Sequence, residues 1–358
     1  MKNILYIVST LKNCGPTNQL YYIIKHLDSS QFTPNIITLS PESGDSAKAH
    51  FESVLGLKIE SLSLSRMQGA FSSLSKVKQY ILDQNIDMVH TQGIRADGLA
   101  KNINIPKIST LRNFPYSDYP TKFGKLKGYF MALSHMKIVK SNKDNCIACS
   151  KSIADEFYAN GLKLRYIQNG VDLDKYFPLS QEDKLVLRGR LNIGINKKVL
   201  ITVGSLIPRK NVKTIIDAFN LNSEKDSILF IIGDGLENKE LQSIAANNIR
   251  FLGNVRNVVE YLQISDCFIS ASLAEGLPNS VLEAMSCNLP LLLSDIPPHK
   301  ELCSENAFFF KVHDVDGLSK AISSFNVYDP GLSNLVTKNF SAHLMSTRYQ
   351  KLYLEKTC

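Results

Sequence analysis

The segment AEGLPNSVLEAM, residues 274–285, places one glutamate on either side of a Gly-Leu-Pro-Asn-Ser turn that should open a helix. Free N–H groups at a helix N-terminus, together with the helix dipole, favour an anion such as phosphate. Glu275 precedes the helix. Its carboxylate would repel a phosphate there unless the carboxylate binds neutral hydroxyl groups of a molecule attached to that phosphate. Glu283 lies one turn inside, although Ser280-x-x-Glu283 also matches a capping box. Two hydroxyl-binding carboxylates around a phosphate describe a nucleotide sugar, with ribose on one side and hexose on the other.

A second group of charged residues lies in the segment LIPRKNVKTII. Arg209 and Lys210 precede Asn211, a predicted N-cap, and cations at the positive end of a helix are unfavourable by about 0.3 to 1 kcal/mol each. A bound diphosphate would offset this cost; the alternative is two solvated loop cations. The next predicted strand ends in IIGDG, where Gly233 and Gly235 suit a close backbone approach.

Parallel sheets must position these residues, and the sequence pattern predicts two such sheets. Short β-branched runs alternate with helical patterns from end to end, which indicates an α/β fold. The pattern runs from NILYIVS to RYIQNG and then restarts at KKVLITVGS. The length of 358 residues also favours two domains over one. We therefore expect two Rossmann-like domains around a central cleft, residues 1–176 and 177–340, and a last amphipathic helix in residues 341–358.

Other common functions lack their signatures. The first turn, STLKNCGPTNQL, contains no GxGxxG and no acidic residue ends the second strand, which excludes a dinucleotide dehydrogenase. A Walker A motif is absent as well. Asp172-x-Asp174 and Asp314-x-Asp316 spell D-x-D, a metal-binding motif of another fold. The first belongs to the interdomain linker and the second to a surface loop, so we expect no metal.

The net charge of +8 comes entirely from the first half of the chain. Residues 1–180 contain 22 lysines and arginines against 14 acidic residues, whereas residues 181–358 contain 19 of each. From Arg112 to Lys143, basic residues are interleaved with aromatic ones, and the segment TKFGKLKGYFMALSHMKIVK within this range is typical of an interfacial amphipathic helix attracted to anionic lipid or an acidic ligand. A solvated charged helix is the alternative. Nucleic acid is not expected, because no binding module accompanies the basic residues.

Several of these segments together resemble family 4 glycosyltransferases, retaining enzymes of the GT-B fold. The nucleotide-binding half of that family is similar to VGSLIPRKN, IIGDG, NVVEYLQISDCFISAS and EGLPNSVLEAMSCNLPLLLSD. Its acceptor domain and linker are similar to CGPTNQL, IDMVHTQGIRADGLA, IACSKSIADEFYANG and IQNGVDLDKYFP. FSAHLMSTRYQKLY resembles the C-terminal helix that returns to the first domain. The resemblance covers nearly the whole chain.

On the donor side, the resemblance implies a role for each matching residue. Glu283 would hold ribose hydroxyls, Glu275 would face the transferred sugar, and backbone N–H groups near Asn279 and Ser280 would meet the diphosphate. Lys210 would neutralise the leaving diphosphate, whose charge grows as the glycosidic bond breaks. The remaining donor-side positions are Gly204, Ser205, Gly233, Gly276 and Leu277.

The chain departs from the family pattern at two positions, Ser205 on the donor side and Gln92 on the acceptor side. The family usually has an arginine at the position of Ser205, and Arg209, four residues on, would substitute for it. His90 ends a strand and fits the family's histidine, while Gln92 replaces its frequent second histidine. The other acceptor-side residues are Gly15 and Arg95.

We therefore expect a retaining, metal-independent glycosyltransferase, without a cofactor, that moves a sugar from a nucleoside diphosphate sugar to an acceptor hydroxyl. The basic first half suggests a lipid-linked glycan, as in bacterial O-antigen, lipopolysaccharide or capsule assembly. We expect a cytoplasmic protein, because no apolar run reaches the length of a membrane span and seven cysteines fit a reducing compartment. It would be peripheral on the inner face of the membrane through Arg112 to Lys143. A nucleotide-sugar epimerase of the same fold and a catalytically silent nucleotide-sugar-binding protein are the alternatives.

Overall fold

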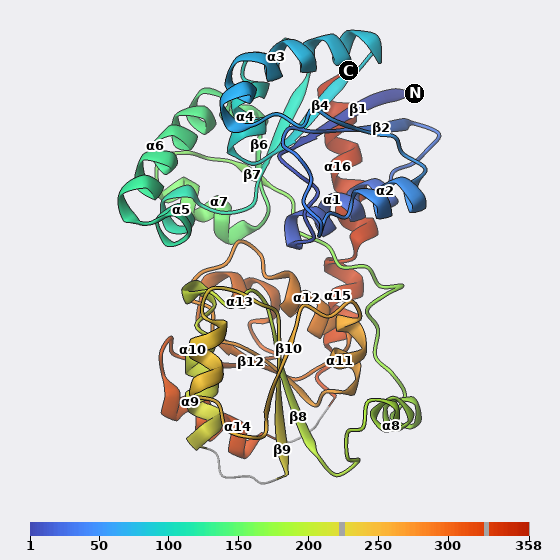
Figure 1. Cartoon of the computed structure of the whole chain (residues 1–358). Coiled ribbons are helices and arrows are strands. Elements are labelled where there is room, and N and C mark those ends of the chain that lie inside the picture. Colours follow the sequence, from blue (N-terminus) through green and yellow to red (C-terminus); the bar gives the residue numbers. More distant parts are fainter. Residues whose placement is uncertain (222–225, 326–328, 358) are drawn as a thin grey trace. The chain divides into compact units, whose positions relative to one another are not determined.

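Figure 1 shows a computed structural model of the chain, which describes residues 1–221, 226–325 and 329–357. The chain forms two compact units. Unit 1 comprises Met1–Gly170 and Ala342–Cys358, and unit 2 comprises Val171–Ser341. The first boundary lies before residue 176, because Val171 and Tyr176 pack in the core of unit 2 and Val171 bridges Ser341.

Unit 1 contains a seven-stranded parallel sheet in the order β3-β2-β1-β4-β5-β6-β7. The strands are β1 (Lys2–Val8), β2 (Phe32–Thr38), β3 (Ile59–Ser61), β4 (Met88–Gln92), β5 (Lys107–Leu111), β6 (Cys146–Ala148) and β7 (Arg165–Tyr166). The helices are α1 (Gly15–Lys25), α2 (Lys48–Leu55), α3 (Arg66–Asp83), α4 (Ile94–Ala100), α5 (Pro115–Phe123), α6 (Lys125–Ser141), α7 (Lys151–Ala159) and α16 (Ala342–Thr357), with a 3-10 turn η1 (Lys143–Asn145).

Both faces of this sheet are covered, as the uninterrupted apolar run of β1 requires. Ile4 and Tyr6 pack into one hydrophobic cluster, with residues of α1 and α16. Leu5 and Ile7 point to the opposite face and pack into another, with residues of α3 and α4. The predicted α/β architecture is therefore confirmed for this unit.

Unit 2 repeats the design with a six-stranded parallel sheet in the order β10-β9-β8-β11-β12-β13. The strands are β8 (Lys198–Val203), β9 (Ser227–Ile232), β10 (Ile249–Gly253), β11 (Cys267–Ser270), β12 (Leu291–Ser294) and β13 (Phe308–Phe310). The helices are α8 (Gln181–Arg190), α9 (Val212–Leu221), α10 (Asn238–Ser243), α11 (Val258–Ile264), α12 (Asn279–Ser286), α13 (Pro297–Cys303), α14 (Val315–Ser324) and α15 (Leu332–Asn339), with a 3-10 turn η2 (Pro208–Lys210).

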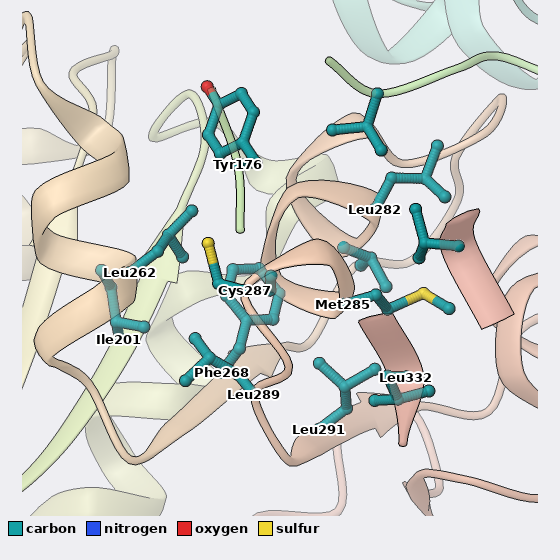
Figure 2. Packing of buried hydrophobic residues seen from close by; sticks show 14 of the residues in the cluster. Tyr176, Ile201, Leu262, Phe268, Leu282, Met285, Cys287, Leu289, Leu291 and Leu332 are labelled. Carbon is teal, nitrogen blue, oxygen red and sulfur yellow. The ribbon is translucent and has the colours of Figure 1, made fainter. Parts of the chain in front are cut away.

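Helix α12 is anchored in the larger hydrophobic cluster of unit 2. Leu282 and Met285 of this helix belong to one cluster with Phe268 of β11 and Leu291 of β12 (Figure 2). The residues of α12 that face this cluster are fully buried. Since a parallel sheet binds ligands at the carboxyl ends of its strands, this packing holds the start of α12 at that edge, next to β11.

The basic segment from Arg112 to Lys143 contains two helices, and most of the predicted amphipathic helix TKFGKLKGYFMALSHMKIVK lies in the second of them, α6. Helix α5 ends at Phe123 and α6 begins after Gly124. The inner side of α6 buries Ala132, His135 and Met136. Its outer surface exposes three large apolar side chains among exposed lysines: Leu126, Tyr129 and Phe130, at 75%, 52% and 62%.

The C-terminal helix α16 completes the core of unit 1. Tyr349 and Tyr353 are fully buried in a cluster with residues of β1 and α1. The Tyr353 hydroxyl lies 2.8 Å from His90 Nδ1 and 3.2 Å from the Tyr6 hydroxyl. Tyr349 donates to or accepts from Thr110 Oγ1 at 2.9 Å. The last turns of the chain therefore satisfy polar groups of strands at its beginning.

This packing predicts a position-specific loss of stability in α16. Tyr353→Ala should lower the free energy of unfolding by about 3 to 5 kcal/mol. The change leaves a large cavity and removes the partner of the Tyr6 hydroxyl and of His90 Nδ1. Leu354→Ala, at a 38% exposed neighbour, should change it by less than about 1 kcal/mol. Urea unfolding of the full chain measures both. Equal losses would contradict the docking of α16.

Candidate functional site

The loops that follow β8 and β9 contact each other at the carboxyl edge of the unit 2 sheet. Gly233 has a φ of +128°, and a Cβ atom there would collide with the carbonyl oxygen of Gly204. A Cβ atom at Gly235 would collide with the carbonyl oxygen of Leu206. Both positions therefore require glycine, and the close approach predicted from IIGDG is between two backbone segments.

The Glu275 carboxylate is the centre of the site, and both cations of the β8 loop reach it. Its side chain is only 7% exposed, with Lys210 Nζ 2.5 Å from Oε1 and Arg209 Nη1 3.1 Å from Oε2. Arg209 also donates to the carbonyl oxygen of Ala274 at 2.6 Å. Burial alone would raise the pKa of Glu275, but the charges of Lys210 and Arg209 overcome it and lower this pKa to about 2. Glu275 is therefore ionised, and the three groups together retain one formal positive charge.

A line of buried hydroxyl groups connects Glu275 to a buried histidine. Ser272 Oγ donates to Glu275 Oε1 at 2.7 Å and lies 3.3 Å from Ser270 Oγ, which lies 3.3 Å from His299 Nε2. His299 Nδ1 lies 2.8 Å from the carbonyl oxygen of Ser294, so Nδ1 carries the hydrogen and Nε2 is the acceptor. Burial lowers the pKa of His299, which keeps the ring neutral. Through Ser272, this network holds the Glu275 carboxylate in place.

Helix α12 begins at Asn279, and Pro278 occupies its N-cap, where it offers no side-chain acceptor. Ser280 is therefore inside the helix. The capping-box interpretation of Ser280 and Glu283 is wrong, because that motif requires the serine at the N-cap. Glu283 needs another explanation.

Glu283 lies half-buried near the segment that enters unit 2. Burial raises the pKa of its carboxyl group to about 7, although Lys175, a hydrogen bond with Tyr176 and the more distant Lys210 lower it. Ser286 Oγ donates to the carbonyl oxygen of Tyr176 at 2.6 Å, which holds this residue against α12. The Tyr176 hydroxyl points away from the hydrophobic cluster (Figure 2). The charge of Lys210 thus acts on both carboxylates that the sequence singled out.

The other donor-side residues lie on the same loops. Ser205 is exposed after β8, and Gly276, Asn279 and Ser280 are half-buried around the start of α12. Leu277 packs its side chain into the hydrophobic cluster, so only its backbone can meet a ligand. A small pocket is lined by residues at the ends of β8 and β11 and in the loops that follow them, among them Gly204, Leu206, Lys210, Ser270 and Ser272.

His90 does not lie at a surface of unit 1, which corrects its assignment as a catalytic residue. The side chain is fully buried, with Nδ1 2.8 Å from the Tyr353 hydroxyl and Nε2 2.7 Å from Thr110 Oγ1. Burial, aided by the charge of Arg112, lowers its pKa to about 3. A neutral histidine with both nitrogens engaged is a core residue, not an acid or base for a substrate.

The other three acceptor-side residues lie near the carboxyl edge of the unit 1 sheet. Gly15 is the first residue of α1. Arg95, in the first turn of α4, donates to Ser40 Oγ. Gln92 ends β4 and accepts hydrogen bonds from Arg112. These contacts join neighbouring loops of unit 1.

Sequence reasoning missed Ser270, Ser272, His299 and Tyr176. The serines lie in SDCFISAS, which reads as a buried strand, and a lone histidine in SDIPPHKEL carries no spacing signal. Tyr176 lies in the predicted linker, where no periodicity places it against α12. Asp314, set aside as a metal ligand, caps α14 by accepting from the Gly317 N–H at 2.8 Å.

Two parallel-sheet units with a charged, glycine-bounded site at a strand edge define a glycosyltransferase of the GT-B fold. The chain belongs to the corresponding family. A model of Glycosyltransferase Family 4 matches residues 14–175, and a model of Glycosyl transferases group 1 matches residues 183–327. The family and the fold class predicted from the sequence are confirmed.

Relatives and solved structures agree with this assignment. The chain is 28% identical over 342 residues to UDP-Gal:alpha-D-GlcNAc-diphosphoundecaprenol alpha-1,3-galactosyltransferase of Escherichia coli, covering 87% of this chain and 84% of that protein. It is 24% identical to the O-antigen biosynthesis glycosyltransferase WclY of Escherichia coli, over 98% and 97% of the two chains. Its fold matches Anabaena Alr3699/HepE in complex with UDP-glucose, with a TM-score of 0.82, 17% identity and coverage of 99% and 100%.

The raised pKa of Glu283 predicts a pH-dependent effect of Glu283→Gln. Between pH 4.5 and about 7 the carboxyl group keeps its proton in the folded protein and loses it in the unfolded chain. The free energy of unfolding of the wild-type protein therefore falls as the pH rises through that range. The variant lacks this loss. Its free energy of unfolding relative to wild type should therefore rise by about 1 to 3 kcal/mol from pH 4.5 to pH 8.

Urea unfolding of the full chain at both pH values measures this difference. Glu305→Gln, on the exposed surface of unit 2, is the matched control. A variant that tracks wild type at both pH values would show that Glu283 is solvated.

Proposed function

We propose that this glycosyltransferase moves one sugar from a nucleoside diphosphate sugar to a hydroxyl group of a lipid-linked glycan, with retention at the anomeric carbon and without a metal ion. The observation that carries the proposal is the buried Glu275 carboxylate held by Lys210 and Arg209 beside the start of α12. This arrangement supports the donor-side roles that the sequence assigned.

The site has the charge that a diphosphate needs. Two cations share one carboxylate, so one positive charge remains for the ligand, and the N–H groups at the start of α12 add to it. As the glycosidic bond breaks, the charge on the leaving diphosphate grows, and Lys210 stabilises it. In this proposal, these groups take the place of a metal ion. Glu283 accepts hydrogen bonds from ribose hydroxyls in its ionised form.

The environment of Glu275 favours attack from the same face as the leaving group. A carboxylate that pairs with two cations and has a pKa of about 2 is a weak base and a weak nucleophile. Glu275 then binds hydroxyl groups of the transferred sugar. The acceptor hydroxyl attacks an oxocarbenium-like sugar, and an oxygen of the leaving diphosphate takes its proton.

The relatives support a lipid-linked acceptor. The Escherichia coli galactosyltransferase uses, by its name, a sugar linked to diphosphoundecaprenol, and WclY takes part in O-antigen biosynthesis. We place this chain in bacterial surface polysaccharide assembly on the same grounds. The enzyme would work at the inner face of the cytoplasmic membrane, where such lipid carriers and nucleotide sugars meet.

The α5–α6 pair supplies a surface for peripheral contact with that membrane. Leu126, Tyr129 and Phe130 are exposed beside the exposed Lys125 and Lys127, so apolar and cationic side chains share one surface. Such a combination binds anionic lipid by shallow insertion and by charge. Across the described ranges of the chain, no helix has the length and apolar character of a membrane span.

A transfer assay with purified protein tests the proposed reaction. Incubation with candidate nucleotide sugars should release nucleoside diphosphate only when a membrane extract or lipid-linked acceptor is added. Lys210→Ala should lower kcat by about 10²-fold or more with a smaller effect on donor binding, because its charge matters most as the diphosphate leaves. Lys213→Ala, an exposed lysine paired with Asp217 on α9, should behave as wild type.

Four results would contradict parts of this scheme. Donor turnover without acceptor would indicate an epimerase, and binding without any turnover would indicate a silent binding protein. An active Lys210→Ala variant would remove the leaving-group assignment, and a crippled Arg209→Ala variant would transfer it to that residue.

Vesicle sedimentation tests the membrane surface. The protein should bind anionic but not neutral vesicles, and binding should weaken as salt shortens the Debye length from about 10 Å at 0.1 M to 3 Å at 1 M. Changing Lys122, Lys125 and Lys127 to Gln should reduce binding by roughly 1 kcal/mol for each lysine. The matched control changes three exposed lysines of unit 2 to Gln: Lys239, Lys311 and Lys338. Binding that ignores lipid charge, or falls equally in both triple variants, would contradict this surface.

A further inference from the structure

Arg112 follows β5 directly, and neutral amide groups hold its guanidinium. Nε and Nη2 lie 3.2 and 3.0 Å from Gln92 Oε1, and Nη1 lies 2.6 Å from Asn169 Oδ1. Gln92 ends β4, and Asn169 follows β7. The carboxyl ends of three strands of the unit 1 sheet thus fix one cation at the edge where parallel sheets bind ligands.

The charge of Arg112 has no counter-charge in these contacts. Over residues 1–221, 226–325 and 329–357, the ion pairs of the structure include none with Arg112, although the side chain is half-buried. A guanidinium group has five N–H donors, and the three hydrogen bonds leave two of them for a ligand. A partly desolvated cation with only neutral partners favours the arrival of an anion.

Gln92 carries a second unused donor at the same place. Its side chain is 8% exposed, and Nε2 is buried without a hydrogen-bond partner among the described residues. This nitrogen belongs to the amide whose oxygen accepts from Arg112, so it lies beside the guanidinium. Turning the amide over would set its NH₂ group against the cation, so the orientation is fixed. A buried donor without a partner destabilises the protein, and an acceptor oxygen of a ligand would remove this cost.

The segment that carries Asn169 is itself held rigidly. Gln19 of α1, at 1% exposure, donates to the carbonyl oxygen of Gly170 at 2.8 Å and accepts from the Gly170 N–H at 3.0 Å. Asn169 is the preceding residue, so its side chain approaches Arg112 from a fixed backbone. The guanidinium is therefore preorganised before any ligand arrives.

We infer that Arg112 and Gln92 form a phosphate-binding site in unit 1, separate in sequence from the donor site of unit 2. The inference rests on the proposed function and specifies its substrate contacts. The guanidinium pairs with phosphate oxygens through its two remaining N–H groups, and Gln92 Nε2 donates to the same phosphate. Two phosphates have this chemistry: the diphosphate of a lipid-linked acceptor and the diphosphate of the donor.

Gln92→Glu is the decisive variant. The new carboxylate keeps the shape of the side chain and still accepts from Arg112, but it neutralises the cation and replaces the unused donor with an anionic oxygen. A purely structural contact would gain strength, so the thermal midpoint should stay or rise while phosphate affinity falls. Arg112→Gln removes the hydrogen-bond partner of Gln92 and Asn169, so it changes both the stability of unit 1 and the phosphate-binding group. Arg165→Gln, at an exposed arginine of unit 1 paired with Glu355, is the control.

Calorimetric titration of the full chain compares farnesyl diphosphate with farnesol, in the presence of saturating UDP or GDP, whichever binds in a donor screen. Wild type and Arg165→Gln should prefer farnesyl diphosphate by about tenfold or more, and Gln92→Glu should lose this preference with nucleotide affinity unchanged. If Gln92→Glu instead weakens nucleoside diphosphate binding about tenfold, the site holds the donor phosphate.

Equal affinities of Gln92→Glu and wild type for all of these probes would overturn the inference. A lower thermal midpoint of Gln92→Glu would overturn it too, since Arg112 would then not face this side chain. Failure of the proposed function has a different signature, because wild type would bind no nucleoside diphosphate.

Discussion

One buried carboxylate orders the site of unit 2. The charge of Glu275 is tolerable at 7% exposure only because Lys210 and Arg209 surround it. Those cations lie on the loop after β8, whose path depends on the contact with the glycines after β9. Ser272, just after β11, donates a hydrogen bond to the carboxylate. Segments that are far apart in sequence therefore share one electrostatic centre.

The sequence allowed the architecture to be predicted, and it singled out the charged residues that the structure brings together at Glu275. Alternating strand and helix patterns marked both sheets, because fully buried parallel strands need uninterrupted apolar runs. The residues around Glu275 were predicted because cations and carboxylates at strand ends are unusual unless they serve a ligand. The direct pairing of Lys210 with Glu275 was not predicted, since the two residues lie 65 positions apart on the loops after β8 and β11, and the distance between these loops depends on tertiary packing.

His90 shows where reasoning along the chain fails. His90 and Gln92 alternate with Thr91 on β4 and point to the same face, so the pattern alone could not separate them. The separation comes from α16, which begins more than two hundred residues later and covers His90 with Tyr349 and Tyr353. Gln92, one step closer to the strand end, escapes this cover and meets Arg112 instead. The position along the strand therefore decides which residue lies under α16 and which lies at the carboxyl edge of the sheet.

The place of α16 also sets an order for synthesis. Tyr6 and Tyr353 meet in the same core, and 347 positions separate them along the chain. While the ribosome is still making the middle of the protein, the first sheet lacks the helix that covers one of its faces. Unit 2, whose residues are contiguous, can close its own core before that helix emerges. The first sheet therefore exposes an apolar face until α16 is synthesised, and transiently exposed apolar surface is prone to aggregation.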